Sequence, residues 1–422
     1  MGMPMKRGLA KPRSGLVAAL DVGTTKVCCF VAQIGGEGNI RVVGIGHQKS
    51  RGLRAGAIID MDAAEESIRG AVHAAEQMAE ETIREVFVNL TCGTPLSQTV
   101  AVEVSIAGHE VGDTDLRRVL GQGYLLNDAS EREIIHSIPV SYTIDGSNGI
   151  RDPRGMYGER LGVNMHVVSA SAGSVRNLKT CVARCHLDLQ ALVVSPYAAG
   201  LATLVEDEMD LGVTCIDMGG GSTSISVFFD GEVIYTDCIP VGGQYVTSDI
   251  ARGLSTPLVH AERMKTLYGS TFATSSDEHD VVDVPQVGED EHASPNHVPK
   301  SILVSIIQPR LEETFELVRG RLEASGVDRT AGRRVVLTGG ASQLQGVREL
   351  AALVLDKQVR MGRPLRIGGL ADSTAGPAFA TCAGLLQYAL TRFAGSPSRA
   401  RRVQEPPSDV FGRFGVWLRE NL

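Results

Sequence analysis

The chain has 422 residues, of which 43% are hydrophobic, and a formal net charge of −8 at pH 7. This length exceeds what one hydrophobic core usually covers, so we expect two large domains or several subdomains. The acidic balance, without a basic stripe interleaved with aromatic residues, argues against general affinity for nucleic acid, and no apolar run reaches the length of a membrane span.

Residues 1–15 are short and basic and lack the apolar segment of a signal peptide, so we expect a disordered N-terminus and a cytosolic body. The eight cysteines are scattered through apolar stretches, which is typical of small buried side chains in a reducing compartment. The pattern Cys181-x-x-x-Cys185-His186 has no second pair of ligands at a suitable spacing, so a helix core is favoured over a zinc site.

The first strong pattern is an apolar strand over residues 16–22, followed by a short turn and a second strand that reaches residue 34. The turn consists of Gly23, Thr24, Thr25 and Lys26. This pattern predicts a β-hairpin whose tip exposes backbone N–H groups. Because glycines let the backbone approach an anion and hydroxyls add donors, such a tip suits a phosphate.

Helical periodicity begins near Asp60 or Asp62, either of which is a suitable N-cap. The apolar face of the expected helix consists of Ile68, Ala71, Val72, Ala75 and Met78. A strand is expected over residues 86–91. From about residue 91 to residue 165 the pattern changes to strands over 100–106 and 137–144 around a helix over 113–121. We therefore expect an inserted α+β subdomain within an α/β chain.

The pattern of the first hairpin recurs at residues 213–229, so the chain is internally duplicated. The second turn consists of Gly219, Gly220, Gly221, Ser222 and Thr223. A single turn of this kind is more often structural than ligand-binding, but two facing tips would clamp one nucleotide. Asp21 and Asp217, each near the end of the first strand of its hairpin, are placed to hold a hydrated Mg²⁺ between the two halves.

Two later segments extend this candidate site. Gly242 and Gly243 lead into a helix, and Glu262 and Lys265 share one face of a following helix, where they either flank a ribose or form a solvated ion pair. The spacing alone favours the ion pair. A strand over residues 335–338 runs into a turn suited to a nucleobase or sugar, or into an ordinary loop before a helix. That turn consists of Gly339, Gly340, Ala341 and Ser342.

The segment over residues 270–299 is rich in Ser, Asp, Glu and Pro and predicts a mobile acidic loop. Residues 394–408 predict a flexible linker, and residues 409–422 predict an amphipathic helix. The apolar face of this helix includes Val410, Phe411, Phe414, Trp417 and Leu418. Aromatic side chains with flanking arginines favour binding to an anionic membrane surface, and the alternative is a helix that docks on the body of the protein.

Several of these segments together resemble the FtsA family of bacterial cell-division proteins, within the actin-like ATPase superfamily. The matching segments are Asp21-Val-Gly-Thr-Thr-Lys26, Ser195-Pro-Tyr to Glu208, Asp217-Met-Gly-Gly-Gly-Ser222-Thr223, Val246-Thr-Ser-Asp-Ile-Ala251 and Leu337-Thr-Gly-Gly-Ala-Ser342. They occur in the order of the superfamily, and the resemblance covers nearly the whole chain.

This resemblance implies an actin-like, duplicated ribonuclease-H-type α/β fold with two large domains and four subdomains. Subdomain IA then comprises residues 16–90, 166–205 and 372–393, the inserted α+β subdomain IC comprises 91–165, subdomain IIA comprises 206–250 and 335–371, and subdomain IIB comprises 251–334 with the acidic loop 270–299. The subdomain peculiar to this family is expected to mediate contacts in a homopolymer and with other division proteins.

By the same resemblance, ATP and Mg²⁺ are the expected cofactors. The phosphates are expected at Gly23 to Lys26 and at Gly219 to Thr223, with Gly242 and Gly243 beside them. The adenosine is expected at Gly339 to Ser342, the ribose at Glu262 and Lys265, and the Mg²⁺ shell at Asp21 and Asp217.

One position departs from relatives such as the heat-shock chaperones, which carry a glutamate where this chain has Ser195. A serine orients water but is a poor base near neutral pH, so we expect slow hydrolysis at most. The resemblance also implies that the C-terminal tail of the tubulin-like division protein FtsZ docks on subdomain IIB, with Arg310 in contact. The protein is thereby expected to tether FtsZ at the cytoplasmic face of the inner membrane at the division site.

Three other assignments within the same superfamily remain open from the sequence. A small-molecule kinase would need a catalytic carboxylate in a substrate pocket, and no such residue can be nominated. A chaperone-like ATPase would need a β-rich substrate domain. A pilus-assembly ATPase with the same insert is harder to exclude by pattern, although the apolar C-terminal segment argues against it.

Overall fold

A computed structural model of the protein describes residues 15–35, 39–125, 131–275, 277–288, 295–365 and 367–394. The segment up to residue 14, nearly all of the predicted linker 394–408 and the predicted membrane helix 409–422 lie outside these residues. In the part of the chain that the structure describes, no helix combines the length and the apolar character needed to cross a membrane.

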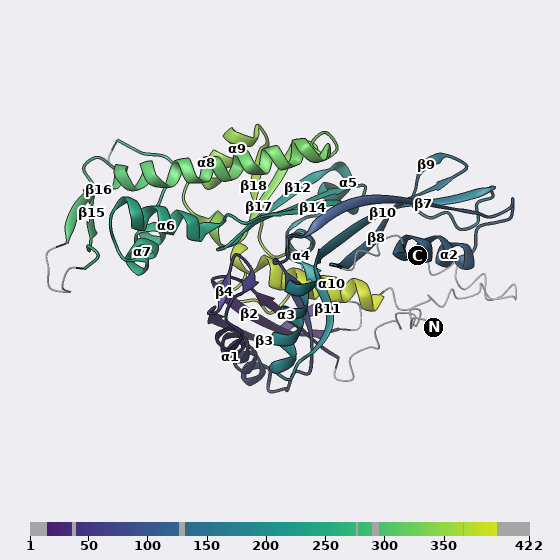
Figure 1. The fold of residues 1–422 in the computed structure, drawn as a ribbon, viewed down its shortest axis with the longest axis horizontal. Coiled ribbons are helices and arrows are strands. Elements are labelled where there is room, and N and C mark those ends of the chain that lie inside the picture. Colours follow the sequence, from purple (N-terminus) through teal and green to yellow (C-terminus); the bar gives the residue numbers. More distant parts are fainter. Residues whose placement is uncertain are drawn as a thin grey trace, which may run out of the picture.

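Two five-stranded sheets with the same topology form the body of the protein (Figure 1). The first follows the order β3-β2-β1-β6-β11, with β1 (Leu16–Val22), β2 (Lys26–Ile34), β3 (Ile40–Lys49), β6 (Glu85–Leu90) and β11 (Asp188–Val194). The second follows the order β14-β13-β12-β17-β18, with β12 (Val213–Met218), β13 (Thr223–Phe229), β14 (Glu232–Ile239), β17 (Arg334–Thr338) and β18 (Gln358–Met361). In each sheet an antiparallel hairpin is followed by a parallel strand beside its first strand. The predicted duplication and the predicted α/β class are therefore confirmed.

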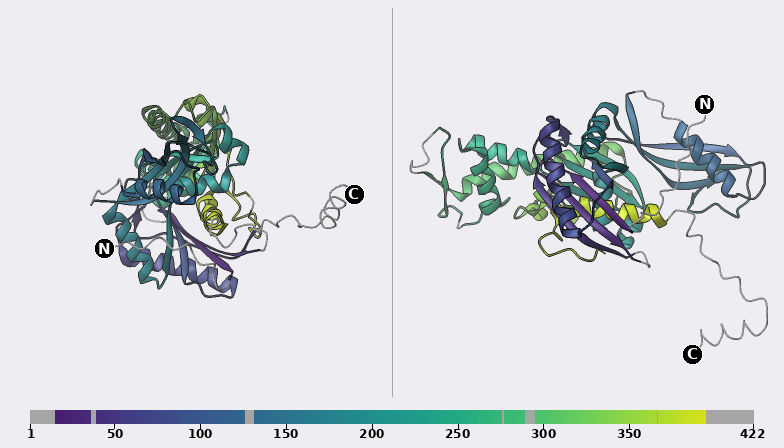
Figure 2. Two further views of the ribbon diagram at one scale, coloured as in Figure 1. Left: turned by 90° about the vertical axis from the view of Figure 1, so that its right-hand side faces the viewer. Right: turned by 90° about the horizontal axis from the view of Figure 1, so that it is seen from below.

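Helices cover both faces of the first sheet. They are α1 (Met61–Ala79) and α3 (Ala172–Arg184) on one face, and α4 (Ser195–Thr203) and α10 (Ala380–Ala394) on the other. Figure 2 shows α1 lying against the strands of this sheet. Asp60 caps α1 as predicted, because its carboxylate accepts hydrogen bonds of 3.1 Å from the N–H groups of Asp62 and Ala63. A short ribbon, β4 (Leu53–Arg54) and β5 (Ala57–Ile58), precedes it.

The prediction that Met78 belongs to the apolar face of α1 is wrong, since its side chain is 58% exposed. The reason is a close approach between α1 and β3. A Cβ built on Gly44 would lie 2.3 Å from the carbonyl oxygen of Ala75 and 2.8 Å from Cβ of Ala79. Only small side chains fit against a glycine at that distance, so Ala75 and Ala79 occupy the buried face and Met78 turns outward.

The second sheet carries the remaining helices of the body. They are α5 (Glu206–Leu211), α6 (Gly243–Gly253), α7 (Leu258–Tyr268), α8 (Lys300–Ser325) and α9 (Val347–Leu355), with 3₁₀ turns at Gly340–Gln343 and Pro377–Phe379. The long helix α8 lies along this half, and α6 and α7 project beyond the sheet (Figure 1). A shared apolar core joins the sheet to α6, α7, α8 and α9, which is why this projecting unit is continuous with the body.

The segment predicted as a mobile loop, residues 270–299, contains regular structure. Strands β15 (Val281–Val284) and β16 (Asn296–Pro299) pair antiparallel. Val282 and Val284 are buried in the same core as α8, whereas Val281 and Asp283 face outward. A strand of only four alternating residues gives a weak periodic signal, so the acidic composition around it predicted a loop.

The inserted subdomain is a four-stranded sheet in the order β7-β10-β8-β9 with one helix on its outer face. Its elements are β7 (Leu96–Ser105), α2 (Asp113–Leu125), β8 (Arg132–Ile144), β9 (Ser147–Ile150) and β10 (Arg160–Ser171). It lies at the opposite end of the molecule from α6 and α7 (Figure 1). Strand β10 continues without a break past Met165 and leads directly into α3, so the insert and the body share a continuous strand.

Candidate functional site

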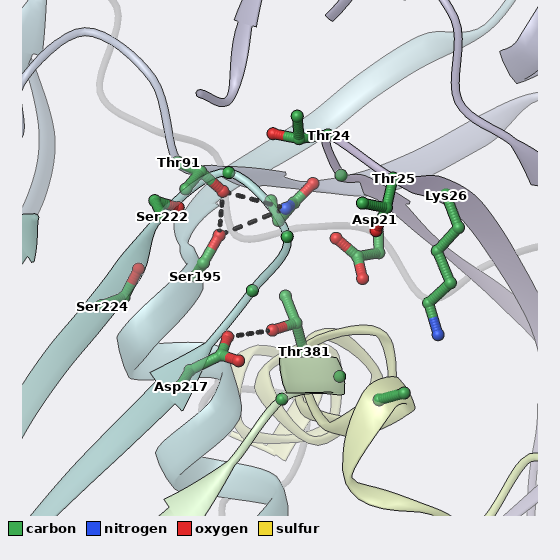
Figure 3. A pocket seen from close by; sticks show the side chains of 18 of the residues that line it. Asp21, Thr24, Thr25, Lys26, Thr91, Ser195, Asp217, Ser222, Ser224 and Thr381 are labelled. Carbon is green, nitrogen blue, oxygen red and sulfur yellow. Dashed lines mark hydrogen bonds between the residues drawn. The ribbon is translucent and has the colours of Figure 1, made fainter. Parts of the chain in front are cut away.

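A cavity of about 180 Å³ lies between the two hairpin tips (Figure 3). Its lining comes from both halves of the chain and comprises Asp21, Gly23, Thr24, Thr25, Lys26, Asn89, Thr91, Ser195, Asp217, Gly219, Gly220, Gly221, Ser222, Ser224, Gly339, Gly340, Pro377, Ala378 and Thr381. The fold thus brings together two segments that the sequence identified separately.

The two tips have the same backbone geometry. The N–H of Gly23 donates to the carbonyl of Lys26 at 3.1 Å, and the N–H of Gly219 donates to the carbonyl of Ser222 at 2.8 Å. The turns also approach one another closely, because a Cβ on Gly220 would lie 2.2 Å from Cγ2 of Thr25. Only glycine permits this approach, so the second tip needs its glycines for packing against the first as well as for access to a ligand.

Asp21 and Asp217 are equivalent residues of the two sheets, and both carboxylates point into the cavity (Figure 3). Burial raises the pKa of Asp21 to about 7; the positive charge of Lys26 lowers this pKa and the charge of Asp217 raises it further. Burial also raises the pKa of Asp217, against a hydrogen bond of 2.8 Å from the Thr381 hydroxyl and the charge of Lys26. Two buried like charges of this kind favour a cation between or beside them.

Lys26 is held at the opening of the cavity by an aromatic ring. Its Nζ lies 3.3 Å from the centre of the Phe379 ring, a cation–π contact. The ammonium group is therefore fixed beside Asp21 and Asp217, where it lowers the pKa of both. A positive charge at this place also suits a ligand that carries several negative charges.

Ser195 lies in a wall of hydrogen-bonded polar side chains that the sequence did not reveal. Its Oγ is 2.6 Å from Oγ1 of Thr91, and Nδ2 of Asn89 donates to it at 3.2 Å. Oδ1 of Asn89 in turn accepts from the N–H of Val22 at 2.6 Å. Asn89 and Thr91 were missed because a strand that ends in polar residues has no distinctive spacing, and Thr381 was missed because it opens an ordinary apolar helix.

Several predicted residues support the tips from behind and do not line the cavity. The Thr223 hydroxyl donates to the carbonyl of Val241 at 2.8 Å, and the N–H of Gly243 donates to the carbonyl of Gly219 at 3.0 Å. A Cβ on Gly242 would lie 2.6 Å from the backbone nitrogen of Ser222. These positions fix the shape of the second tip.

The turn over residues 339–342 contributes only its two glycines to the cavity. Gly339 has φ +89°, and a Cβ there would lie 2.3 Å from Oδ1 of Asp217. The Ser342 hydroxyl donates to the carbonyl of Gly339 at 2.7 Å and so stabilises the turn, while Ala341 lies against Gly243. Glycine at position 339 is therefore required both by its backbone conformation and by its distance from the carboxylate.

Comparison with known proteins identifies the family of this chain. The family model described as "Cell division protein FtsA" matches residues 214–384, and the model "SHS2 domain inserted in FTSA" matches residues 93–169. A cell division protein FtsA of Rhizobium meliloti (strain 1021) is 43% identical over 436 residues, which cover 100% of this chain and 98% of the relative. The chain belongs to the FtsA family of cell-division proteins.

More distant FtsA proteins match over nearly their whole length as well. The protein of Pseudomonas aeruginosa is 33% identical over 420 residues, 98% of this chain and 100% of the relative. The protein of Escherichia coli (strain K12) is 32% identical over 415 residues, 96% of this chain and 98% of the relative. The resemblance drawn from the sequence motifs is therefore confirmed.

Solved structures show that the FtsA chain has an actin-like fold. A chain of the "PilM-PilN type IV pilus biogenesis complex" superposes with a TM-score of 0.64 at 18% identity and covers 89% of this chain and 98% of that chain. MreB5 of Spiroplasma citri bound to ADP superposes with a TM-score of 0.53 at 13% identity and covers 92% of this chain and 98% of that chain. At these identities the similarity concerns the fold alone.

In this FtsA-family chain Glu262 and Lys265 bond to one another, the interpretation that their spacing favoured. Nζ of Lys265 lies 2.7 Å from Oε2 of Glu262, 2.8 Å from Oγ1 of Thr247 and 3.1 Å from the carbonyl oxygen of Gly243. Neither side chain lines the cavity. The lysine side chain is only 16% exposed, so this network does more than a surface ion pair and holds α7 on the first turn of α6.

Arg310 lies on α8 and joins it to α6. Its guanidinium donates to both carboxylate oxygens of Asp249 and forms an ion pair with Glu313, and it lies 6.0 Å from the centre of the Tyr245 ring. The hydrogen bond with Asp249 raises the pKa of Arg310. Arg310 therefore has a structural role between α6 and α8, and 26% of its side chain is exposed.

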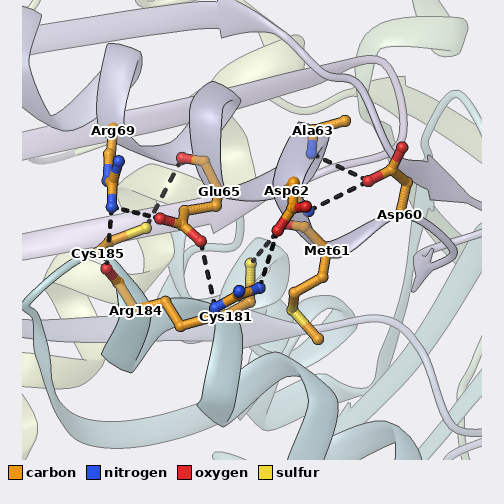
Figure 4. Close-up of polar contacts among 9 residues, drawn as sticks. All are labelled: Asp60, Met61, Asp62, Ala63, Glu65, Arg69, Cys181, Arg184 and Cys185. Atoms are coloured by element: carbon orange, nitrogen blue, oxygen red, sulfur yellow. Dashed lines mark hydrogen bonds and ion pairs between the residues drawn. The ribbon is translucent and has the colours of Figure 1, made fainter.

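The Cys181–Cys185 pair packs between two helices of the FtsA body (Figure 4). The thiol of Cys181 lies 4.0 Å from the carbonyl oxygen of Met61, and the thiol of Cys185 lies 3.7 Å from that of Glu65. Burial raises the pKa of both thiols. This agrees with the prediction that the two cysteines belong to a helix core.

The Asp21 carboxyl predicts a pH dependence of stability. Its pKa is about 7 in the folded chain, against an ordinary value of 3.8, so the folded state holds this proton more tightly than the unfolded state does. The resulting stabilisation is fully present below pH 3.8 and is lost as the pH rises through about 7. We expect the free energy of unfolding of Asp21→Asn, relative to the wild type, to grow by about 2 kcal/mol between about pH 5 and about pH 8.

Urea unfolding without nucleotide or divalent cation measures this difference. Asp372→Asn is the matched control, because Asp372 is exposed and does not line the cavity. A constant offset between Asp21→Asn and the wild type at both pH values would contradict the expected burial of the charge.

Proposed function

We propose that this FtsA-family protein binds ATP with Mg²⁺ between its two hairpin tips and that the nucleotide controls its assembly during cell division. The observation that carries this proposal is the pair of equivalent turns that face one cavity, each containing hydroxyl side chains and each preceded by an aspartate whose carboxylate enters the cavity. Turns of this kind expose backbone N–H groups to a phosphate, and Lys26 adds a positive charge. A fold neighbour, MreB5 of Spiroplasma citri, is described as bound to ADP, which supports the choice of ligand.

The residues present fit a magnesium ion held chiefly through water and phosphate oxygens. Mg²⁺ prefers oxygen ligands and keeps several of its waters, so one or two carboxylates suffice when a phosphate completes the shell. Asp21 and Asp217 supply those carboxylates, and burial has raised the pKa of each in the absence of a divalent charge. When bound, the ion would neutralise charge on the phosphates, while Thr381 holds the Asp217 carboxylate in place.

The size of the cavity indicates which part of the nucleotide it can accommodate. Small-molecule sites usually measure about 300–1,000 Å³, whereas this cavity measures about 180 Å³. Phosphates and the cation fit such a volume, and the sugar and base need additional room. The network of Lys265, Glu262 and Thr247 lies outside the lining of the cavity, so these residues would have to exchange bonds with one another for contacts to the ribose.

Calorimetry with ATP and Mg²⁺ tests this proposal. We expect binding by the wild type and affinity at least about tenfold weaker for Asp217→Asn, because the loss of one carboxylate removes a charge-assisted contact to the hydrated ion. We expect Asp356→Asn, at an exposed aspartate far from the cavity, to bind like the wild type. Turnover should stay below about 1 s⁻¹, since Ser195 offers no effective general base. No heat of binding for any adenine nucleotide with Mg²⁺ would refute the proposal.

We also propose that residues 409–422 attach the protein to the inner face of the cytoplasmic membrane. The sequence places Val410, Phe411, Phe414, Trp417 and Leu418 on one face of a helix, and burial of about five such side chains gains several kcal/mol before the cost of folding. Single molecules should therefore bind reversibly. A homopolymer would bind tightly, because neighbouring subunits present their apolar segments at high effective concentration.

Co-sedimentation with anionic liposomes tests the membrane proposal. Deletion of residues 410–422 should release the protein into the supernatant, and Trp417→Glu in the full chain should weaken binding by about tenfold or more, because a charge is costly at that depth. Glu420→Gln, on the polar side of the same segment, is the control and should sediment at least as well as the wild type. Equal sedimentation of the deleted and the full-length protein would show that this segment is not the anchor.

For partners, we propose that the FtsZ C-terminal tail docks on subdomain IIB near Arg310, while the inserted subdomain contacts neighbouring subunits and other division proteins. An acidic tail would compete with Asp249 and Glu313 for the guanidinium, which is partly exposed. The protein would then tether FtsZ at the division site through its own membrane segment.

Substitution of Arg310 tests the contact with the FtsZ tail. Arg310→Gln should raise the Kd for a tail peptide about fivefold or more by removing one charge-assisted pair. Glutamine is preferable to glutamate, because a third carboxylate beside Asp249 and Glu313 would also separate α6 from α8. Arg319→Gln, at an exposed arginine of the same helix, is the control and should leave the Kd unchanged. An unchanged Kd for Arg310→Gln would remove this residue from the contact.

A further inference from the structure

A histidine of the inserted subdomain contacts the backbone beside Ser195. Nε2 of His136, on β8, lies 3.0 Å from the backbone nitrogen of Val194, the last residue of β11. Ser195 follows directly and opens α4. The insert thus reaches the strand end that carries Ser195 into the wall of the cavity, although the rest of its sheet lies away from the cavity.

The chemistry of this hydrogen bond fixes the state of the ring. The N–H of Val194 can only donate, so Nε2 of His136 must accept, and a neutral ring then carries its proton on Nδ1. Val194 is completely buried and His136 is 4% exposed, so water cannot replace the ring as acceptor. An unpaired buried N–H is costly, and this bond therefore resists separation of the insert from the strand end.

The same ring packs in an aromatic cluster that spans the parts of the molecule around the cavity. It meets Tyr197 of α4 edge-on, with ring centres 5.4 Å apart, and Tyr388 of α10 at 5.9 Å. Tyr197 in turn stacks on Phe228 of β13, in the second sheet, at 6.1 Å. Helix α4 carries Ser195 and α10 carries Thr381, which donates to Asp217. A shift of β8 would therefore move two elements that line the cavity.

Ser195 itself is sensitive to such a shift. Its hydroxyl is placed by Thr91 at 2.6 Å and by Asn89 at 3.2 Å, both on the β6 side of the cavity. These contacts come from the first domain, whereas His136 holds the preceding residue, Val194, through its backbone N–H. A displacement of less than an ångström at Val194 would lengthen one or both of these hydrogen bonds beyond useful range.

We propose that His136 is a positioning residue through which the inserted subdomain sets the geometry of the Ser195 wall. This inference rests on the proposed nucleotide site and adds to it a direct link from the subdomain expected to bind partners. A partner that binds the inserted subdomain would change the position of Ser195 through the side chain of His136. His136 touches no ligand in this scheme and acts only through Val194 and α4.

Two substitutions test the hydrogen-bond acceptor and the aromatic ring of His136 one at a time. His136→Phe keeps a ring beside Tyr197 and Tyr388 but removes the acceptor, and His136→Gln keeps an acceptor but removes the ring. We expect His136→Phe to lower kcat for ATP hydrolysis about fivefold in steady-state experiments, with KM within about twofold of the wild type. His136→Gln should retain kcat within about twofold. Tyr157→Phe, at an exposed site of the same insert, should behave as the wild type.

Amide hydrogen exchange gives a readout that does not depend on nucleotide. The Val194 amide should exchange at least about tenfold faster in His136→Phe than in the wild type, and no more than about threefold faster in His136→Gln. If His136→Phe does not fold, His136→Gln still tests the inference, because a fivefold loss of kcat with the acceptor retained would overturn it.

The remaining outcomes distinguish the inference from the proposed function. Normal ATP binding with equal kcat in the wild type and His136→Phe would overturn the inference alone. Equal losses of kcat in both variants, together with equal drops in melting temperature, would show a purely structural role and overturn it as well. Absence of nucleotide binding in the wild type would overturn the proposed function, and the positioning role would fall with it, whatever the exchange of Val194 shows.

Discussion

Two carboxylates, one buried and one half-buried, enter the same cavity beside a pair of glycine turns, and they are the constraint around which the described structure is arranged. Burial raises the pKa of both Asp21 and Asp217, and the charge of Asp217 raises the pKa of Asp21 further. A chain keeps such an unfavourable pair only where something offsets it. Lys26 and the hydroxyl of Thr381 supply part of that compensation, and a hydrated cation with phosphates would supply the rest.

The duplicated topology explains why these two residues meet. In each sheet an aspartate lies near the end of the first strand, and the turn that follows bends back over the strand end. When two such sheets pack with their hairpins facing, this packing alone brings the two aspartates to the same cavity. The close contact between Gly220 and Thr25 shows how little space remains, since any side chain at Gly220 would force the two halves apart.

The inserted subdomain adds a connection that a plain duplicated fold does not have. Its strand β10 runs unbroken into α3, and its strand β8 bonds to the backbone beside Ser195. The insert is therefore fastened to the first domain both covalently and through a buried hydrogen bond. Its far end, with β9 and α2, lies away from the two five-stranded sheets (Figure 1).

The sequence by itself determined the two hairpins, the aspartates, the glycine turns and the family, because each depends on local composition at a fixed spacing. It did not determine the Asn89–Thr91–Ser195 wall, the support given by Thr381, or the contact of His136 with Val194. Those pairs join residues that are far apart in the chain, and no local pattern records which strands become neighbours. The helical periodicity misjudged Met78, because a close helix–sheet contact admits only small side chains there. The acidic composition of the 270–299 segment concealed the short strands β15 and β16. Tertiary structure decided these features, since burial and hydrogen-bond partners exist only after distant segments have packed together.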